Sequence, residues 1–188
     1  MDRIEPWQLT TRPTLTRGER RTIFPDALGR APVAANVRCR PMVSLPPFMF
    51  EAKEYDIPRL IQEWRWLVPP QHMPLLISIF GDWVFGAPDQ SHWVLSVLEG
   101  DYTKIARNST EFNTFKSSFE WLDKHFIAGW QEIAHRHGLS PSMDQCLGWK
   151  IHPLLGGKFE VANLQVFDMT LYQSLMGQLH RESRGISR

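Results

Sequence analysis

Hydrophobic and polar positions in the middle of the chain predict short β-strands. Residues 75–80, LLISIF, form a continuous apolar run with β-branched members, which is typical of a buried strand. Residues 92–98, HWVLSVL, alternate instead, with one side formed by Trp93, Leu95 and Val97. Three turn-like segments separate the strands: Gly81, residues 88–90 and residues 99–101. We therefore expect an antiparallel meander of three or four strands.

A helical period predicts one long helix after the meander. Ser117 and Glu120 have the spacing of a capping box, and Gly138 is placed to end the helix. The apolar positions between them recur at 3.6 residues and are Phe119, Leu122, Phe126, Trp130, Ile133 and His137.

Shorter helices are predicted where a capping side chain precedes an apolar stripe. Asp56 is followed by Pro58 in the first turn, and that stripe continues to Leu67. Asn108 or Ser109 begins a second short helix. Asp168 caps the last one, whose stripe is Tyr172, Leu175, Met176 and Leu179.

Before the last helix the pattern predicts two more strands, CLGWKI at 146–151 and FEVANLQVF at 159–167. Gly156 and Gly157 lie between them and permit the positive φ of a tight hairpin turn. Strands that pair locally, with helices between them, indicate an α+β fold. The expected architecture is an antiparallel sheet, a meander plus a C-terminal hairpin, covered by helices.

The N-terminal part of the chain has a different composition. Residues 1–41 hold eight arginines and four acidic residues (8 − 4 = +4), and five prolines prevent a long helix there. The arginines are dispersed among acidic residues and lack interleaved aromatic residues, so solvated loops are favoured over a nucleic-acid-binding arm. We expect a basic, proline-containing arm over residues 1–50 and a domain over residues 51–188.

The overall composition excludes several classes of protein. The net charge of +1 gives no strong field for nucleic acid, and no apolar run approaches the ~20 residues of a membrane span. No signal peptide opens the chain, so Cys39 and Cys146 are expected as reduced thiols in the cytoplasm.

A search for catalytic and metal-binding patterns returns no specific candidate. His135 and His137 diverge on a helix instead of converging on a metal, and no G-x-S-x-G elbow is present. Gly156-Gly157-Lys158 lacks the spacing of a phosphate loop, and Phe159 stands where a hydroxyl would be needed. We expect no catalytic residue, no metal and no cofactor, which favours a binding protein over an enzyme.

Three segments resemble a known family. Residues 153–164, PLLGGKFEVANL, are similar to the P-x-L-G-G-x-[FY]-x-x-x-N core of the type VI secretion immunity domain that is often found after a GAD-like region. Residues 177–181, GQLHR, resemble its closing helix, and residues 80–85, FGDWVF, resemble its fGd-aromatic strand. The resemblance covers residues 74–183, while residues 1–50 do not resemble a GAD-like domain.

Membership of this family implies a cytoplasmic antitoxin that binds and neutralises a cognate effector toxin, in some members a nuclease. It implies no catalytic residue, and it gives a structural role to Gly81, Asp82, Gly156, Gly157 and Asn163. The alternative is a bacterial ligand-binding or regulatory α+β module without a toxin. A nucleic-acid-binding protein and an enzyme are weaker candidates.

The expected partner surface lies on turns of the meander. Tryptophan is enriched at binding hot spots, and an acidic, aromatic surface suits a basic nuclease cleft. The candidate contacts are Asp89, Trp93, Glu99 and Asp101.

Overall fold

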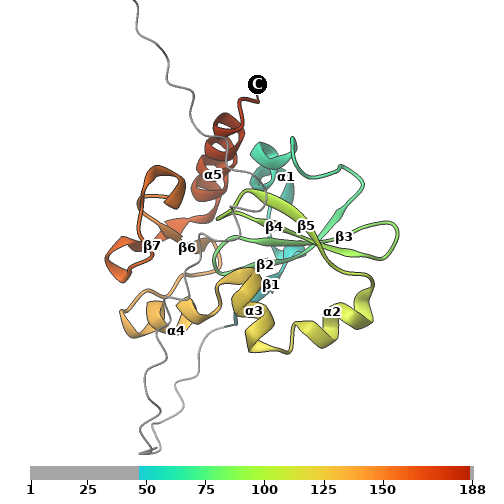
Figure 1. The fold of residues 1–188 in the computed structure, drawn as a ribbon, viewed down its shortest axis with the longest axis horizontal. Helices are drawn as coiled ribbons and strands as arrows, with labels where there is room; N and C mark the ends of the chain where they lie inside the picture. The colour runs from blue at the N-terminus through green and yellow to red at the C-terminus, as the bar shows by residue number, and fades with distance from the viewer. Residues whose placement is uncertain (1–46, 187–188) are drawn as a thin grey trace, which may run out of the picture. The chain divides into compact units, whose positions relative to one another are not determined.

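The computed structural model describes residues 47–186, so the expected arm lies outside the described residues except for its last four positions. This part of the chain has an α+β fold with a five-stranded antiparallel sheet and a separate two-stranded sheet (Figure 1). The strands of the larger sheet follow one another in space as in sequence: β1 (Met49–Glu51), β2 (Met73–Ser78), β3 (Trp83–Gly86), β4 (His92–Ser96) and β5 (Asp101–Ala106).

The predicted meander is confirmed in β2 to β5. Trp83 pairs with Leu95, and Val84 pairs with Val94, so alternate residues of each strand point to opposite faces. Strand β1 was not predicted: Phe50, assigned to the arm by sequence, pairs with Ile77 of β2.

One face of the sheet packs against helices from both ends of the described chain. These are η2 (Ala52–Glu54), α1 (Ile57–Leu60), η3 (Gln62–Trp64) and α5 (Met169–Ser183). Asp56 caps α1 as expected, accepting from the Arg59 N–H at 3.4 Å. The predicted continuation of that helix to Leu67 is wrong, because α1 gives way to the 3-10 turn η3, which buries Trp64 completely.

The other face is covered by α2 (Ser109–Phe115) and α3 (Phe119–Phe126), and α4 (Gly129–Arg136) follows (Figure 1). Asn108 caps α2, accepting from the Glu111 N–H at 2.9 Å. The predicted long helix is wrong, since Ile127 adopts a left-handed φ of 50° and separates α3 from α4. Phe126 of α3 packs against Val84 and Val94, whereas Trp130 of α4 packs on Trp149. The two helices therefore belong to different hydrophobic clusters.

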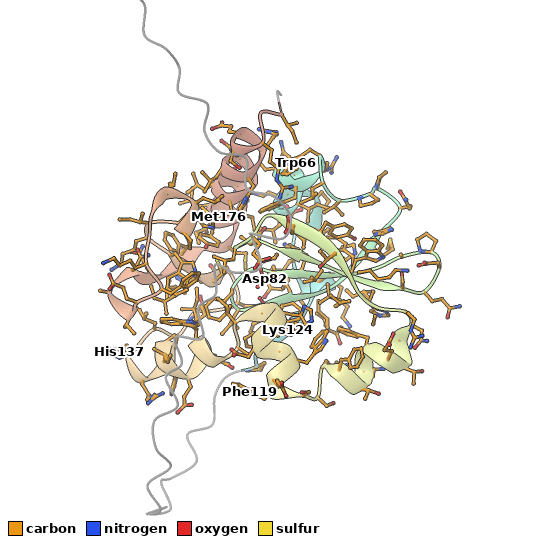
Figure 2. All side chains as sticks on the ribbon, in the orientation of Figure 1. Trp66, Asp82, Phe119, Lys124, His137 and Met176 are labelled. Carbon is orange, nitrogen blue, oxygen red and sulfur yellow. The ribbon has the colours of Figure 1, made fainter. Side chains whose placement is uncertain are left out.

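The start of α3 also differs from the prediction. Ser118, not Ser117, is the N-cap, and its hydroxyl accepts from the Trp121 N–H at 3.3 Å. As a result Phe119 belongs to the first turn and is 65% exposed instead of buried; Figure 2 shows it at the periphery of α3.

The two-stranded sheet consists of β6 (Gln145–Trp149) and β7 (Leu164–Asp168). Trp149 pairs with Leu164, so residues 150–163 form a long connection, with the 3-10 turns η4 (Pro153–Leu155) and η5 (Val161–Asn163). The predicted tight hairpin turn at Gly156-Gly157 is therefore wrong. The Leu147 N–H donates to the Ile79 carbonyl at 2.7 Å and joins this sheet to the larger one.

Helix α5 begins as predicted, with the Asp168 carboxylate accepting from the Leu171 N–H at 2.8 Å. Tyr172 and Met176 are buried, but Leu175, expected in the same stripe, is 46% exposed. The polar residues Gln173 and His180 of the same helix are fully buried instead. None of the helices within residues 47–186 is long and apolar enough to cross a membrane.

Candidate functional site

The four predicted partner contacts fall into two pairs at opposite ends of β4. Asp89 lies in the turn that precedes β4, and Trp93 is its second residue. Glu99 and Asp101 lie in and after the turn that follows it. A five-residue strand is about 17 Å long, so the four side chains do not form one compact patch.

Trp93 is the centre of a group of rings and charges that we call the Trp93 cluster; its members are His72, Asp89, Ser91, Trp93, Tyr102 and Lys104. The Trp93 and Tyr102 rings stack with centroids 5.3 Å apart and planes at 16°. The Tyr102 hydroxyl is hydrogen-bonded to His72 Nδ1 at 2.7 Å, and the His72 ring lies 5.6 Å from the Trp93 ring. The rings are half-buried, so one side of the cluster faces solvent.

Polar contacts hold the Trp93 ring and the Asp89 carboxylate in fixed positions. Trp93 Nε1 donates to Ser91 Oγ at 2.9 Å. The Ser91 hydroxyl and N–H both donate to Asp89 Oδ1, and Lys104 Nζ lies 3.2 Å from Asp89 Oδ2. The hydrogen bonds from Ser91, together with the bond from Lys104, lower the pKa of Asp89 to about 2, so this carboxylate is ionised at neutral pH.

At the other end of β4, the Asp101 side chain has a structural partner. Asp101 Oδ1 accepts from Arg184 Nη2 at 2.8 Å, and the Arg184 guanidinium lies over the Trp66 ring at 5.3 Å. These contacts fasten the end of α5 to β5. Glu99 is exposed, and its backbone N–H donates to Ser96 Oγ at 3.2 Å.

Gly81 of the FGDWVF segment links the sheet to α5. Its φ of +85° forms the turn between β2 and β3, and its carbonyl accepts from Gln173 Nε2 at 2.6 Å. Gln173 Oε1 in turn accepts from Trp64 Nε1 at 2.9 Å. One buried amide therefore connects the turn, α5 and η3.

Asp82 lies in the interior of the molecule, as Figure 2 shows, and is 3% exposed. Its carboxylate accepts from the Val97 N–H at 2.8 Å and from the Ser78 hydroxyl at 3.3 Å. Burial raises the pKa of Asp82 to about 7, because the charged form loses its hydration.

One buried histidine contacts the same backbone, and a second buried histidine packs against the first. His180 Nε2 is hydrogen-bonded to the Val97 carbonyl at 3.0 Å, so both polar groups of the Val97 backbone have titratable partners. The His152 ring packs edge-on against His180, with centroids 5.2 Å apart. Burial lowers the pKa of each histidine to about 4, so both are neutral at pH 7.

The motif residues of the β6–β7 connection bind backbone. Asn163 Oδ1 accepts from the Ile151 N–H, and Asn163 Nδ2 donates to the Ile151 carbonyl, both at 2.9 Å. The side chain thus continues the strand ladder where β7 is absent. Gly157 lies so close that an added Cβ would be 1.7 Å from the Ile151 oxygen, while Gly156 has a φ of +86°. Gly81, Asp82, Gly156, Gly157 and Asn163 are all in positions that shape the fold.

Within the described residues, no group of three or more His, Cys, Asp or Glu side chains is placed to hold a metal ion. Cys146 is completely buried, and burial raises the pKa of its thiol.

The sequence pointed to Asp89 and Trp93 of this cluster. It did not point to the other four members, which are His72, Ser91, Tyr102 and Lys104. A signal existed for two of them, because Tyr102 and Lys104 alternate in YTKIA and share a face when that strand pairs with β4. His72 precedes β2, and its position depends on how the chain leaves η3.

No family model matches the chain, and no curated protein matches it either. Among solved structures, the chain is similar to the crystal structure of Atu4351 from Agrobacterium tumefaciens, with 16% identity and a TM-score of 0.47. The match covers 70% of this chain and 66% of that one, so the chain spans just under two thirds of that protein's length.

Proposed function

We propose that this protein is an immunity protein that binds a cognate type VI secretion effector toxin in the bacterial cytoplasm. It neutralises the toxin by covering the active site. The resemblance of residues 153–164 and 177–181 to an immunity domain supports this class of function. The observation that carries the proposal is the Trp93 cluster, a surface with stacked rings and flanking charges of both signs.

The Trp93 cluster has the properties of an interface anchor. Large aromatic side chains contribute most to binding where they lie near the centre of an interface and the surrounding contacts exclude water. Trp93 is held by Tyr102 and by Ser91, so little side-chain freedom is lost when a partner docks on it. We expect an interface of about 1,200–2,000 Å² in total, centred on this ring.

Toxin neutralisation is tested by survival of a host cell. The product of the gene immediately beside this one is expressed with and without this chain, and colonies are counted. Killing, rescue on co-expression and a stable complex on a sizing column are the expected results. A lethal neighbour that this chain neither rescues nor binds would contradict the proposal.

Trp93→Ala is expected to weaken toxin binding about 100-fold, a loss of about 2.7 kcal/mol, because it removes the central ring of the surface. The dissociation constant is measured by calorimetry, and the survival assay is repeated with the variant. Phe119→Ala is the matched control, since Phe119 is an exposed ring on α3, away from the cluster. Thermal unfolding of both variants confirms that they are folded at the assay temperature. Equal dissociation constants for wild type and Trp93→Ala would place the interface elsewhere.

A further inference from the structure

A cation already occupies the exposed part of the Trp93 cluster. The Lys104 ammonium is 3.2 Å from Asp89 Oδ2 and lies over the Trp93 ring, 5.7 Å from its centroid. A carboxylate and an aromatic ring therefore face the same point in space, and both attract positive charge. The side chains of Lys104 and Asp89 are 42% and 61% exposed, so this point is open to a partner.

Lys104 is a weak occupant of this position. An ion pair between exposed side chains gains little, because both ions are well hydrated when apart and the lysine chain loses freedom when it is held. Lys104 can turn into water at little cost. Asp89 keeps its charge when this happens, because Ser91 continues to donate two hydrogen bonds to Oδ1.

An arginine fits the position better than a lysine. Its planar guanidinium stacks on an indole ring and offers several N–H donors to a carboxylate, and it is less strongly hydrated than an ammonium group. The ring and the carboxylate are already fixed by Ser91 and Tyr102, so an incoming guanidinium meets a preorganised pair of partners.

We infer that the Trp93 cluster takes an arginine side chain of the partner protein, between the Trp93 ring and the Asp89 carboxylate, in place of Lys104. This inference rests on the proposed function, in which the toxin supplies the arginine. In the absence of a partner, the Lys104 ammonium occupies the position that the arginine takes in the complex. An arginine-rich peptide presents the same guanidinium group and is the probe used to test the site.

The test uses the full chain labelled with ¹⁵N, in 150 mM salt. The Trp93 Nε1–H signal, which reports on the bond to Ser91, is assigned by its loss in Trp93→Phe. Peptides of six arginines, six lysines and six glutamates are titrated separately. The expected result is a saturable shift of the Trp93 signal that is strongest with arginine, weaker with lysine and missing with glutamate.

Two variants separate the roles of the charged residues. Lys104→Met removes the competing cation and is expected to tighten arginine-peptide binding about 3- to 10-fold, and Asp89→Asn is expected to abolish the shift. Arg136→Met, which removes an exposed cation beside Glu132 on α4, is the control and leaves the affinity unchanged. Weaker binding in Lys104→Met, or an equal shift with the glutamate peptide, would overturn the inference.

The survival assay separates failure of the inference from failure of the proposed function. Rescue that depends on Trp93, with no shift from the arginine peptide, overturns the arginine site and leaves toxin neutralisation standing. A shift from the arginine peptide without rescue supports the site and overturns the toxin as its partner.

Discussion

Gly157→Ala is expected to lower the free energy of unfolding by about 3 kcal/mol or more. A Cβ at this position would lie 1.7 Å from the Ile151 carbonyl oxygen, a distance that no rotamer change relieves, because both atoms are fixed to backbone. Either the Ile151 peptide or the Gly157 backbone must move.

Movement of Ile151 breaks the contacts that order the β6–β7 connection. Its N–H and carbonyl are both hydrogen-bonded to the Asn163 side chain, and Asn163 Nδ2 also donates to the Lys158 carbonyl at 2.9 Å. Asn163 is 7% exposed, so a displaced partner leaves a buried amide unsatisfied.

Gly156→Ala is the matched comparison, because it changes the neighbouring glycine for a different reason. Gly156 has a φ of +86°, but an added Cβ meets nothing within 4 Å, so only the backbone conformation is penalised, by about 1–2 kcal/mol. Urea denaturation of both variants measures the difference. Similar losses of unfolding free energy in the two variants would contradict this prediction. They would show that the backbone at Ile151 moves away from the added Cβ at little cost.

The meander was predictable because its signals are local. Strands β2 and β4 are read from apolar runs and alternation, and the turns around Gly81 and Asp89 carry the residues that such turns require. The β6–β7 connection was mistaken for a tight turn because two glycines between apolar segments usually mark one. Here Gly157 permits a close backbone approach, Gly156 adopts a positive φ, and the Asn163 side chain replaces the missing strand residue.

The long helix shows the limit of periodicity. The stripe from Phe119 to His137 has a helical period, but Ile127 takes a left-handed conformation that its side chain disfavours. Two contacts accompany the break: Trp130 of α4 packs on Trp149, and Asp123 accepts from the Gly129 N–H at 2.7 Å. The hydrophobic period contains no signal for either contact, and Trp149 is remote in sequence, so the period alone could not reveal the break.

The candidate site was also predictable only where its signals are local. Turn chemistry located Asp89 and Trp93, but grouping them with Glu99 and Asp101 treated two ends of β4 as one surface. Among the residues that suggested the family, Gly81, Asp82 and Asn163 are buried. Leu154 and Leu155 of the same signature are 54% and 65% exposed. The buried members of the signature therefore report on how the chain packs, while the proposed contact surface lies on the Trp93 cluster.

Asp82 and His180 are expected to give the folding stability opposite dependences on pH. Both contact the Val97 backbone, and both are buried without a charged partner at hydrogen-bond distance. The pKa of Asp82 is raised from 3.8 to about 7, so the folded state holds a proton that the unfolded state has lost, and stability increases as pH falls below 7. The pKa of His180 is lowered from 6.5 to about 4, so the unfolded state gains the proton first, and stability decreases as pH falls below 6.5.

The two contributions are similar in size between pH 8 and pH 5. Asp82 adds about 2–3 kcal/mol over this interval, and His180 removes about 2 kcal/mol. His152 acts in the same direction as His180 and removes about 2 kcal/mol more, because its pKa is also lowered to about 4 and the unfolded state gains the proton first. In the wild-type protein the gain from Asp82 offsets only part of the loss from the two histidines, so stability is expected to fall by about 1–2 kcal/mol over this interval.

Single substitutions are expected to reveal the two terms with opposite sign. Asp82→Asn keeps the oxygen that accepts from Val97, and His180→Gln keeps an N–H that can donate to the Val97 carbonyl, so each removes a titration with little change of shape. Between pH 8 and pH 5, Asp82→Asn should lose about 2–3 kcal/mol more stability than wild type, and His180→Gln about 2 kcal/mol less. Urea denaturation of the three proteins at both pH values measures this. Equal changes in all three proteins would mean that neither pKa is shifted by folding. Asp82 and His180 would then have no part in the pH dependence of folding stability.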